Sequence, residues 1–167
     1  MTNEHLDVRQ ISLVFYEEEH QEALELFYLT DEQLQFTASP KAALDVAKSD
    51  KQRFPVVILS ENVPVGFFVL HVGENIQPFT RNPNAILLRA LSVNYEHQGN
   101  GYGKQVLRLL PSFVAMHFGE INEIVLAVNE TNPIAKRLYE KMGYVDKGFR
   151  KEFDKGDQII LHYAVHA

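Results

Sequence analysis

The sequence contains no cysteine. This excludes disulfide bonds, zinc sites built on thiolates and cysteine nucleophiles. It also has no apolar run close to the ~20 residues that a membrane-spanning helix requires. The first ten residues, MTNEHLDVRQ, lack the apolar stretch of a signal peptide. We therefore expect a cytoplasmic protein that has no membrane partner.

Positive charge is also scarce, with 16 Lys and Arg against 22 Asp and Glu and a net charge of −6. Nucleic-acid binding depends on a positive surface, so nucleic acid is not an expected partner. The seven histidines show no metal-ligand spacing on a predicted helix. His162 and His166 could share the face of a strand, but they lack a third ligand, so no metal is expected.

The chain has the length of one domain, 167 residues, and we treat residues 1–167 as a single unit. Alternating and β-branched runs predict strands within 7–16, 55–60, 63–72, 82–93, 123–128 and 144–165, the last segment holding two strands around a turn at 154–157. Apolar residues at helical spacing predict helices within 17–29, 39–50, 104–118 and 132–143, with Pro111 kinking or splitting the third. This order predicts an α/β (α+β) domain with a mixed, mostly antiparallel sheet of six to seven strands and about four helices.

The segment EHQGNGYGKQVL, residues 96–107, places Gly99, Gly101 and Gly103 between a buried strand and a helix. Free N–H groups and the helix dipole make such a helix start an anion site, and glycine leaves the backbone open to the anion. A tight strand–helix turn is the alternative interpretation. The spacing fails the P-loop and dinucleotide patterns, but Q-x-x-G-x-G fits residues 98–103.

Two blocks of the sequence resemble the GNAT superfamily of N-acetyltransferases. The loop after the strand that ends at Val93 resembles that family's acetyl-CoA loop, [RQ]-x-x-G-x-[GA]. The block VNETNPIAKRLYEKMGY resembles the family helix N-x-x-A-x-x-[LF]-Y-x-x-x-G-[FY], and the matching positions are Asn132, Ala135, Leu138, Tyr139, Gly143 and Tyr144. The resemblance implies a fold with a splayed central strand pair, and acetyl-CoA as cosubstrate.

The resemblance also implies where the coenzyme lies. Backbone amides of the glycine loop would hold its pyrophosphate, namely those of Gln98, Gly99, Asn100, Gly101, Tyr102, Gly103 and Lys104. The strand edge formed by Leu91, Ser92 and Val93 would pair with the pantetheine arm. The amide of Leu91 or Ser92 would polarise the thioester carbonyl.

The second block supplies the remaining expected contacts, Asn132, Ala135 and Tyr139. Tyr139 lies two helical turns beyond Asn132, so the two share a face. The Tyr139 hydroxyl would act as the catalytic acid that protonates the departing thiolate. The alternatives are a plain helix cap for Asn132 and a core tyrosine for Tyr139.

The acceptor is expected to be a small-molecule amine. Residues 29–47 and 63–70 resemble the bacterial polyamine acetyltransferases, and the net negative charge would suit a polyamine. Those enzymes carry a carboxylate four residues before the strand-ending valine, where this chain has Arg89. An arginine there favours an amine that also carries a carboxylate or phosphate, unless it forms a structural ion pair. Period-two alternation would place Arg89, Leu91 and Val93 on one face.

Three questions stay open at this point. The general base could be Glu25, Glu22 or Glu96. Instead of an enzyme, the chain could be a silent acetyl-CoA sensor or an unrelated nucleotide-binding domain. An apolar final strand, 159–165, could leave an edge for a homodimer.

Overall fold

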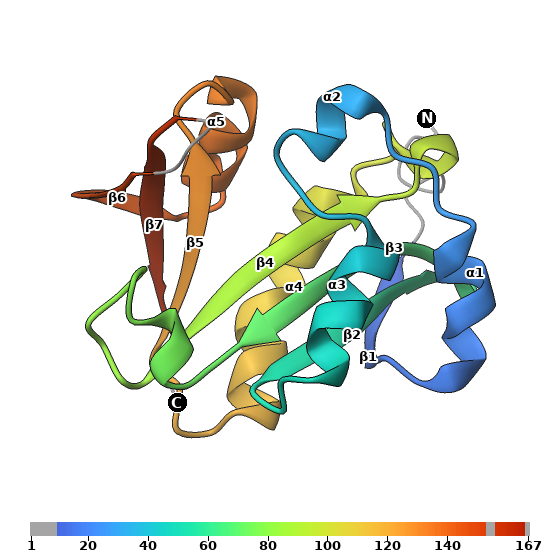
Figure 1. Ribbon diagram of the computed structural model, residues 1–167, viewed down its shortest axis with the longest axis horizontal. Helices are drawn as coiled ribbons and strands as arrows, with labels where there is room; N and C mark the ends of the chain where they lie inside the picture. The colour runs from blue at the N-terminus through green and yellow to red at the C-terminus, as the bar shows by residue number, and fades with distance from the viewer. Residues whose placement is uncertain (1–9, 153–155, 166–167) are drawn as a thin grey trace, which may run out of the picture.

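The computed structural model describes residues 10–152 and 156–165. One seven-stranded sheet runs through the molecule in the order β1-β2-β3-β4-β5-β7-β6 (Figure 1). The strands are β1 Ile11–Phe15, β2 Arg53–Ser60, β3 Val63–His71, β4 Ala85–Val93, β5 Glu123–Asn129, β6 Val145–Lys151 and β7 Gln158–Ala164. The α-helices are α1 Gln21–Glu25, α2 Asp31–Leu34, α3 Pro40–Lys48, α4 Tyr102–His117 and α5 Pro133–Lys141. Short 3-10 turns lie at η2 Glu18–His20, η3 Glu74–Ile76 and η4 Tyr95–His97.

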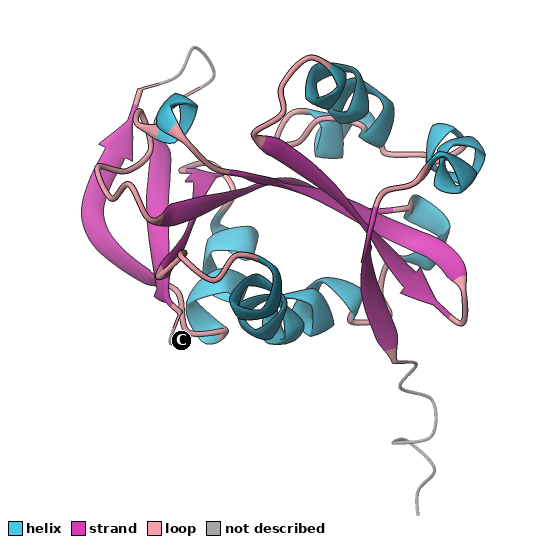
Figure 2. Cartoon of the chain, turned by 90° about the horizontal axis from the view of Figure 1, so that it is seen from below, coloured by secondary structure: helices cyan, strands magenta, loops and turns pink. Residues whose placement is uncertain are grey.

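Helices cover both faces of the sheet (Figure 2). The larger core lies under α4 and α5 and contains Val106 and Leu110, and the partly buried Leu138 packs against it. A smaller core lies under α1 and α3, where Leu24 and Leu44 pack against the sheet. The predicted class and element order are confirmed.

Local sequence signals fixed several element ends. The β2–β3 hairpin turns at Glu61 and Asn62, whose φ angles of 51° and 68° belong to the left-handed region that hairpin turns use. The Ser39 hydroxyl accepts from the Ala42 N–H at 3.2 Å and caps α3, with Pro40 at its first position.

Other expectations were wrong in detail. The predicted helix 17–29 is only the 3-10 turn η2 and the five-residue α1. The short helix α2 was not predicted, although Thr30 and Gln33 form a capping box at its start. Helix α4 runs unbroken from Tyr102 to His117, so Pro111 does not split it.

The final strand is not an edge of the sheet. Strand β7 lies between β5 and β6, so its backbone is paired on both sides. The expectation of a dimer-forming edge at 159–165 is therefore wrong, because β6 returns and covers it. The predicted turn at 154–157 lies partly outside the described residues, as do His166 and the first residues of the predicted strand 7–16.

The two central strands separate halfway along their length. Strands β4 and β5 pair in parallel only from Ala85 to Leu88, opposite Glu123 to Leu126. Beyond Leu88, β4 continues to Val93 without a strand partner on that side, and Figure 1 shows β5 turning away from it. The expected splayed pair is confirmed.

A β-bulge interrupts β4 at the same level. The register with β3 shifts between Phe67 and Val69, so Ala90 and Leu91 stand opposite Phe68 alone. Ala90 adopts a φ of 57°, a conformation that residues other than glycine rarely take.

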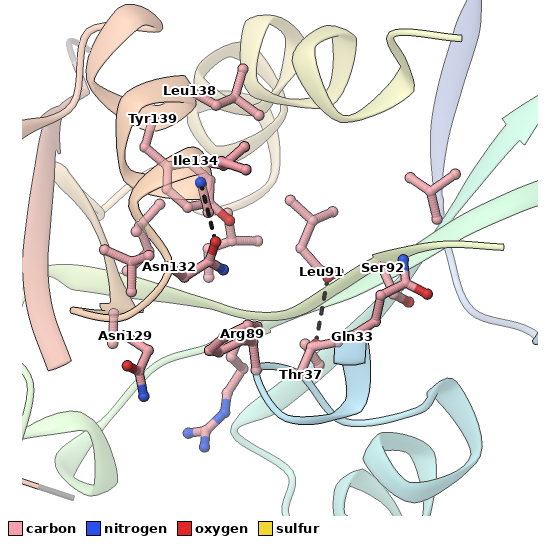
Figure 3. A pocket seen from close by; sticks show the side chains of 18 of the residues that line it. Gln33, Thr37, Arg89, Leu91, Ser92, Asn129, Asn132, Ile134, Leu138 and Tyr139 are labelled. Carbon is pink, nitrogen blue, oxygen red and sulfur yellow. Dashed lines mark hydrogen bonds between the residues drawn. The ribbon is translucent and has the colours of Figure 1, made fainter. Parts of the chain in front are cut away.

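The bulge changes which side chains share a face. Leu91 packs with the core under α4, whereas Ala90 packs with the core under α1 and α3. Arg89 and Leu91 project from opposite sides of β4 (Figure 3). The expectation that Arg89, Leu91 and Val93 point the same way was wrong, because strict alternation does not survive an inserted residue.

Among the described residues, no helix has the length and apolar character needed to cross a bilayer.

Candidate functional site

A cavity of about 800 Å³ opens where β4 and β5 separate. We call it the splay pocket. Its walls come from the second half of β4, the end of β5, the first turns of α5, and α2 with the loop that follows (Figure 3). It is lined by Leu29, Glu32, Gln33, Phe36, Thr37, Leu88, Arg89, Ala90, Leu91, Ser92, Val93, Gln98, Gly99, Leu126, Ala127, Val128, Asn129, Asn132, Ile134, Ala135, Leu138, Tyr139 and Gln158.

The start of α4 is open, as the glycine pattern predicts. Gly99 and Gly101 have φ angles of 81° and 76°, which glycine adopts freely. No side chain caps the helix. A Cβ built on Gly99, Gly101 or Gly103 would meet nothing within 4 Å. The first N–H groups of α4 lack intrahelical partners, and the glycines leave the space beside this helix start open.

Three side chains of the glycine loop turn back onto the protein. The Gln98 amide donates to the Val93 carbonyl at 2.9 Å, and the Asn100 amide donates to the His97 carbonyl at 2.9 Å. The buried Tyr102 hydroxyl donates to Ser60 at 3.1 Å. These contacts hold the loop, so the part of it that is available to a ligand is its backbone. Gln98 and Gly99 line the splay pocket, whereas Asn100, Gly101, Tyr102, Gly103 and Lys104 do not.

The β4 edge also faces the splay pocket. Leu91, Ser92 and Val93 all line it, and the Leu91 carbonyl accepts from the Thr37 hydroxyl at 3.5 Å. The Ser92 hydroxyl is buried and has no hydrogen-bond partner among the described residues.

Helix α5 brings the second block to the same cavity. Asn132 caps the helix, its side-chain oxygen accepting from the Ala135 N–H at 3.3 Å. Asn132, Ala135 and Tyr139 all line the splay pocket (Figure 3). The capping role of Asn132 is therefore present, and it coexists with a position in the pocket wall.

Tyr139 is held in an apolar setting. Burial raises the pKa of its phenol to about 12, so the hydroxyl is protonated at neutral pH. Tyr144 lies behind it, with ring centroids 6.1 Å apart. The Tyr144 hydroxyl is buried and has no hydrogen-bond partner in the described part of the chain.

None of the three expected bases lines the splay pocket. Glu22 and Glu25 are exposed on α1, where Glu25 accepts from Gln21, and Glu96 is exposed in η4. Glu32 on α2 is the one carboxylate in the pocket wall among the described residues. Sequence reasoning missed it because α2 was not predicted, although the capping box TDEQ could have revealed that helix.

A second cavity of about 640 Å³ adjoins the splay pocket. We call it the arginine pocket. It is lined by Leu34, Gln35, Phe36, Thr37, Ala38, Ala42, Ala43, Val46, Arg53, Val69, Phe79, Leu87, Leu88, Arg89, Ala90, Ala127, Asn129 and Gln158. Arg89 and Ala90 line both cavities, so the bulge of β4 forms part of the wall between them.

Arg89 contacts a histidine. One guanidinium nitrogen lies 3.1 Å from Nδ1 of His71, whose side chain is 1% exposed. Burial, helped by the charges of Arg53 and Arg89, lowers the pKa of His71 to about 4. His71 is therefore neutral at physiological pH and accepts from Arg89, which can only donate. Its Nε2 faces Asp50 at 3.4 Å.

The structural ion pair considered for Arg89 is absent from the part of the chain that the structure describes. There, Asp50 pairs with Arg53 at 3.1 Å instead, and Arg89 has no carboxylate within ion-pair distance. Burial, reinforced by the charge of Arg53, lowers the pKa of Arg89.

The buried His71 predicts a pH effect on stability. The unfolded chain binds a proton at a pKa near 6.5, while the folded chain does so only near 4. The unfolded state thus holds more protons between these values, and the free energy of unfolding falls as pH drops from 6.5 to 4. The shift corresponds to about 3 kcal/mol. Denaturant titrations of wild type and His71→Asn should show this loss in the wild type and a flatter profile in the variant; parallel profiles would contradict it.

Comparisons with known proteins agree with this arrangement. A family model described as "Acetyltransferase (GNAT) family" matches residues 8–144. The uncharacterized N-acetyltransferase YbbJ of Bacillus subtilis (strain 168) is 46% identical over 156 residues, which cover 93% of this chain and 98% of that protein. A spermine/spermidine N(1)-acetyltransferase of the same strain is 27% identical over 135 residues, 80% of this chain and 86% of the relative.

Solved structures share the fold at low sequence identity. The crystal structure of the aminoglycoside acetyltransferase AAC(6')-Ib in complex with coenzyme A and kanamycin matches with a TM-score of 0.75 and 18% identity, over 93% of this chain and 95% of that one. The family model spans most of the chain, and the YbbJ relative is similar along nearly its whole length. The chain belongs to the GNAT family of acetyl-CoA-dependent N-acetyltransferases.

Proposed function

We propose that this enzyme transfers the acetyl group of acetyl-CoA to a primary amine of a small molecule by direct attack within a ternary complex. The observation that carries the proposal is the splay pocket, which combines an unpaired β4 edge, an uncapped glycine-rich helix start beside it and a protonated tyrosine in its wall. With no cysteine in the chain, a thiol acyl-enzyme has no nucleophile, and the amine attacks the thioester itself.

Three segments of the chain bind different parts of acetyl-CoA in this proposal. The backbone from Gln98 to Lys104 receives the pyrophosphate at the start of α4. The free edge of β4 at Leu91 to Val93 receives the pantetheine amides as an added strand would, and its N–H groups stabilise the oxyanion. Asn132 and Ala135 form the opposite wall of the channel.

Two groups move protons. The Tyr139 hydroxyl donates to the departing thiolate, and its raised pKa keeps it protonated until then. The apolar setting that disfavours phenolate also disfavours a bare thiolate, so protonation accompanies departure. Glu32 is the carboxylate placed to receive the amine proton, directly or through water.

A polyamine acceptor is the second candidate, supported by the similarity to the Bacillus subtilis spermine/spermidine enzyme. A silent acetyl-CoA sensor is disfavoured because a sensor needs no protonated tyrosine in its pocket. This mechanism does not require a homodimer, and homodimer formation stays a prediction. The assignment of residues 1–167 to a single domain also stays a prediction.

Coenzyme A should protect the protein against heat. A ligand at 100 times its dissociation constant stabilises the folded state by about 2.7 kcal/mol, which raises the melting temperature of a domain of this size by roughly 5–10 °C. ATP and NAD, which lack the pantetheine arm, should give no comparable shift. Differential scanning fluorimetry with each ligand tests the proposal. A shift with ATP or NAD and none with coenzyme A would contradict it.

A further inference from the structure

We propose that the arginine pocket holds the acceptor, and that this acceptor is a primary amine carrying a carboxylate and an apolar side chain. The inference rests on the proposed acetyl transfer and adds the substrate class. It places the carboxylate on Arg89 and the amine at the wall that the two cavities share.

The first argument is charge. Arg53 and Arg89 are the charged residues that line the arginine pocket among the described residues, and no carboxylate lines it. Arg53 is neutralised by Asp50, whereas Arg89 meets the neutral His71. A chain with a net charge of −6 thus keeps in a cavity a partly buried guanidinium that has no carboxylate partner of its own among the described residues, and Asp50, already paired with Arg53, offsets its charge only in part. Burying such a charge is costly unless an anion completes the site.

The second argument is the geometry of the guanidinium. One of its nitrogens is used by His71, which leaves the remaining N–H donors of Arg89 for a ligand. A planar fork of donors matches a carboxylate, and a charge-assisted pair is about twice as strong as a neutral hydrogen bond. A polyamine ammonium would be repelled by the same group.

The third argument is the rest of the lining, which is largely apolar. Leu34, Phe36, Val46, Phe79 and Leu87 contribute to it. The Phe79 ring centroid lies 5.8 Å from the Arg89 guanidinium carbon, so an aromatic face adjoins the anion site. This surface suits a hydrophobic side chain on the acceptor, and its two arginines disfavour a positively charged one.

The fourth argument places the amine. Gln158 lines both cavities, and its side-chain oxygen is buried without a hydrogen-bond partner in the described part of the chain. This oxygen accepts an N–H of the acceptor amine, which then faces the splay pocket. The amine nitrogen bonds to the acetyl carbonyl carbon, and the carbon–sulfur bond breaks. The sulfur gains one proton and the nitrogen loses one, giving the N-acetyl compound and coenzyme A.

The test compares acceptors that differ only in the carboxylate. L-phenylalanine and L-leucine are measured against L-phenylalaninamide and L-leucinamide by thiol release with acetyl-CoA. The amides have the less basic amines, so they would react faster if nothing recognised the carboxylate. We expect kcat/KM to favour the acids by at least about 10-fold, because a charge-assisted hydrogen bond is lost with the amide.

Variants assign the preference to Arg89. Arg89→Gln should raise KM for the acids by about 10- to 150-fold and reduce the acid-to-amide ratio towards one. Arg89→Lys keeps the positive charge but loses the planar fork of donors. Its KM for the acids and its acid-to-amide ratio should lie between those of the wild type and of Arg89→Gln. Arg108→Gln removes the same charge from an exposed site on α4 outside both cavities, and should keep the wild-type ratio.

Several results would overturn the inference. They are an equal or better rate with the amides, a higher kcat/KM for spermidine than for either acid, or an unchanged ratio in Arg89→Gln. If Arg89→Gln does not fold, the wild-type ratio alone decides. Failure of the proposed acetyl transfer is recognised separately, because acetyl-CoA would then release no thiol with any of these amines, with or without a carboxylate.

Discussion

Replacing Tyr139 with phenylalanine should slow acetyl transfer by roughly 10²- to 10⁴-fold, the usual contribution of a positioned general acid. The ring and its packing stay, and only the hydroxyl that would protonate the thiolate is removed. The thermal shift with coenzyme A should persist, since the role that we propose for the hydroxyl is to protonate the leaving group and not to hold the coenzyme. The measurement is the single-turnover rate with saturating amine, which excludes product release.

Tyr144→Phe is the matched control. The two rings are 6.1 Å apart, and the Tyr144 hydroxyl is also buried, but Tyr144 does not line the splay pocket. Removing a hydroxyl without a partner is close to neutral for stability, so this variant should turn over at the wild-type rate. Equal rates for the wild type and Tyr139→Phe would contradict the proposed acid role and indicate that Tyr139 is a core tyrosine.

The pH profile adds an independent check on Tyr139. With its pKa raised to about 12, the phenol does not titrate between pH 6 and 10. The rate should therefore rise with pH as the acceptor amine loses its proton, with no falling limb from Tyr139 in that range.

Gly103→Val should abolish the coenzyme A thermal shift and leave the protein folded. Gly103 has no positive φ, and a Cβ there meets nothing within 4 Å, so the free protein accommodates the side chain. The valine would fill the space in which we place the pyrophosphate. Two lost charge-assisted hydrogen bonds at about 1.5–3 kcal/mol each weaken binding by at least roughly 100-fold, which calorimetric titration measures.

Gly119→Val is the control for this variant. Gly119 follows α4 at its far end, also lacks a positive φ and also faces open space. Its substitution should leave coenzyme affinity unchanged. Gly103→Ala should reduce coenzyme affinity less than Gly103→Val does, because it adds only one methyl group. Unchanged coenzyme affinity in Gly103→Val would contradict the placement of the pyrophosphate at the start of α4.

The sequence predicted the parts of this molecule that depend on local chemistry. Ser39 and Asn132 cap their helices as their side chains dictate, and Gly101 supplies the left-handed backbone at the start of α4. The order of helices and strands along the chain also followed, because apolar periodicity and turn residues mark each element locally, whereas the place of β7 inside the sheet did not follow. The two blocks that resemble the family meet at one cavity.

The parts that could not be predicted depend on tertiary contacts. The inserted residue at Ala90 leaves no local signal, since alanine is not a residue that favours a positive φ. The partner of Arg89 was not foreseen, because His71 reaches it across the sheet from β3. Glu32 was missed because a four-residue helix carries too little periodicity to be recognised.

The bulge at Ala90 separates a side chain that we assign to the acceptor, Arg89, from the backbone segment 91–93 that we assign to the acetyl donor. Alternation restarts after it, so position 89 and positions 91–93 no longer belong to a single repeating pattern. A substitution at Arg89 can change the charge offered to one ligand while the backbone offered to the other keeps its register. With the roles that we propose for Arg89 and for the β4 edge, a related enzyme that shares the bulge could change its acceptor through a single side chain without altering the backbone that holds the acetyl donor.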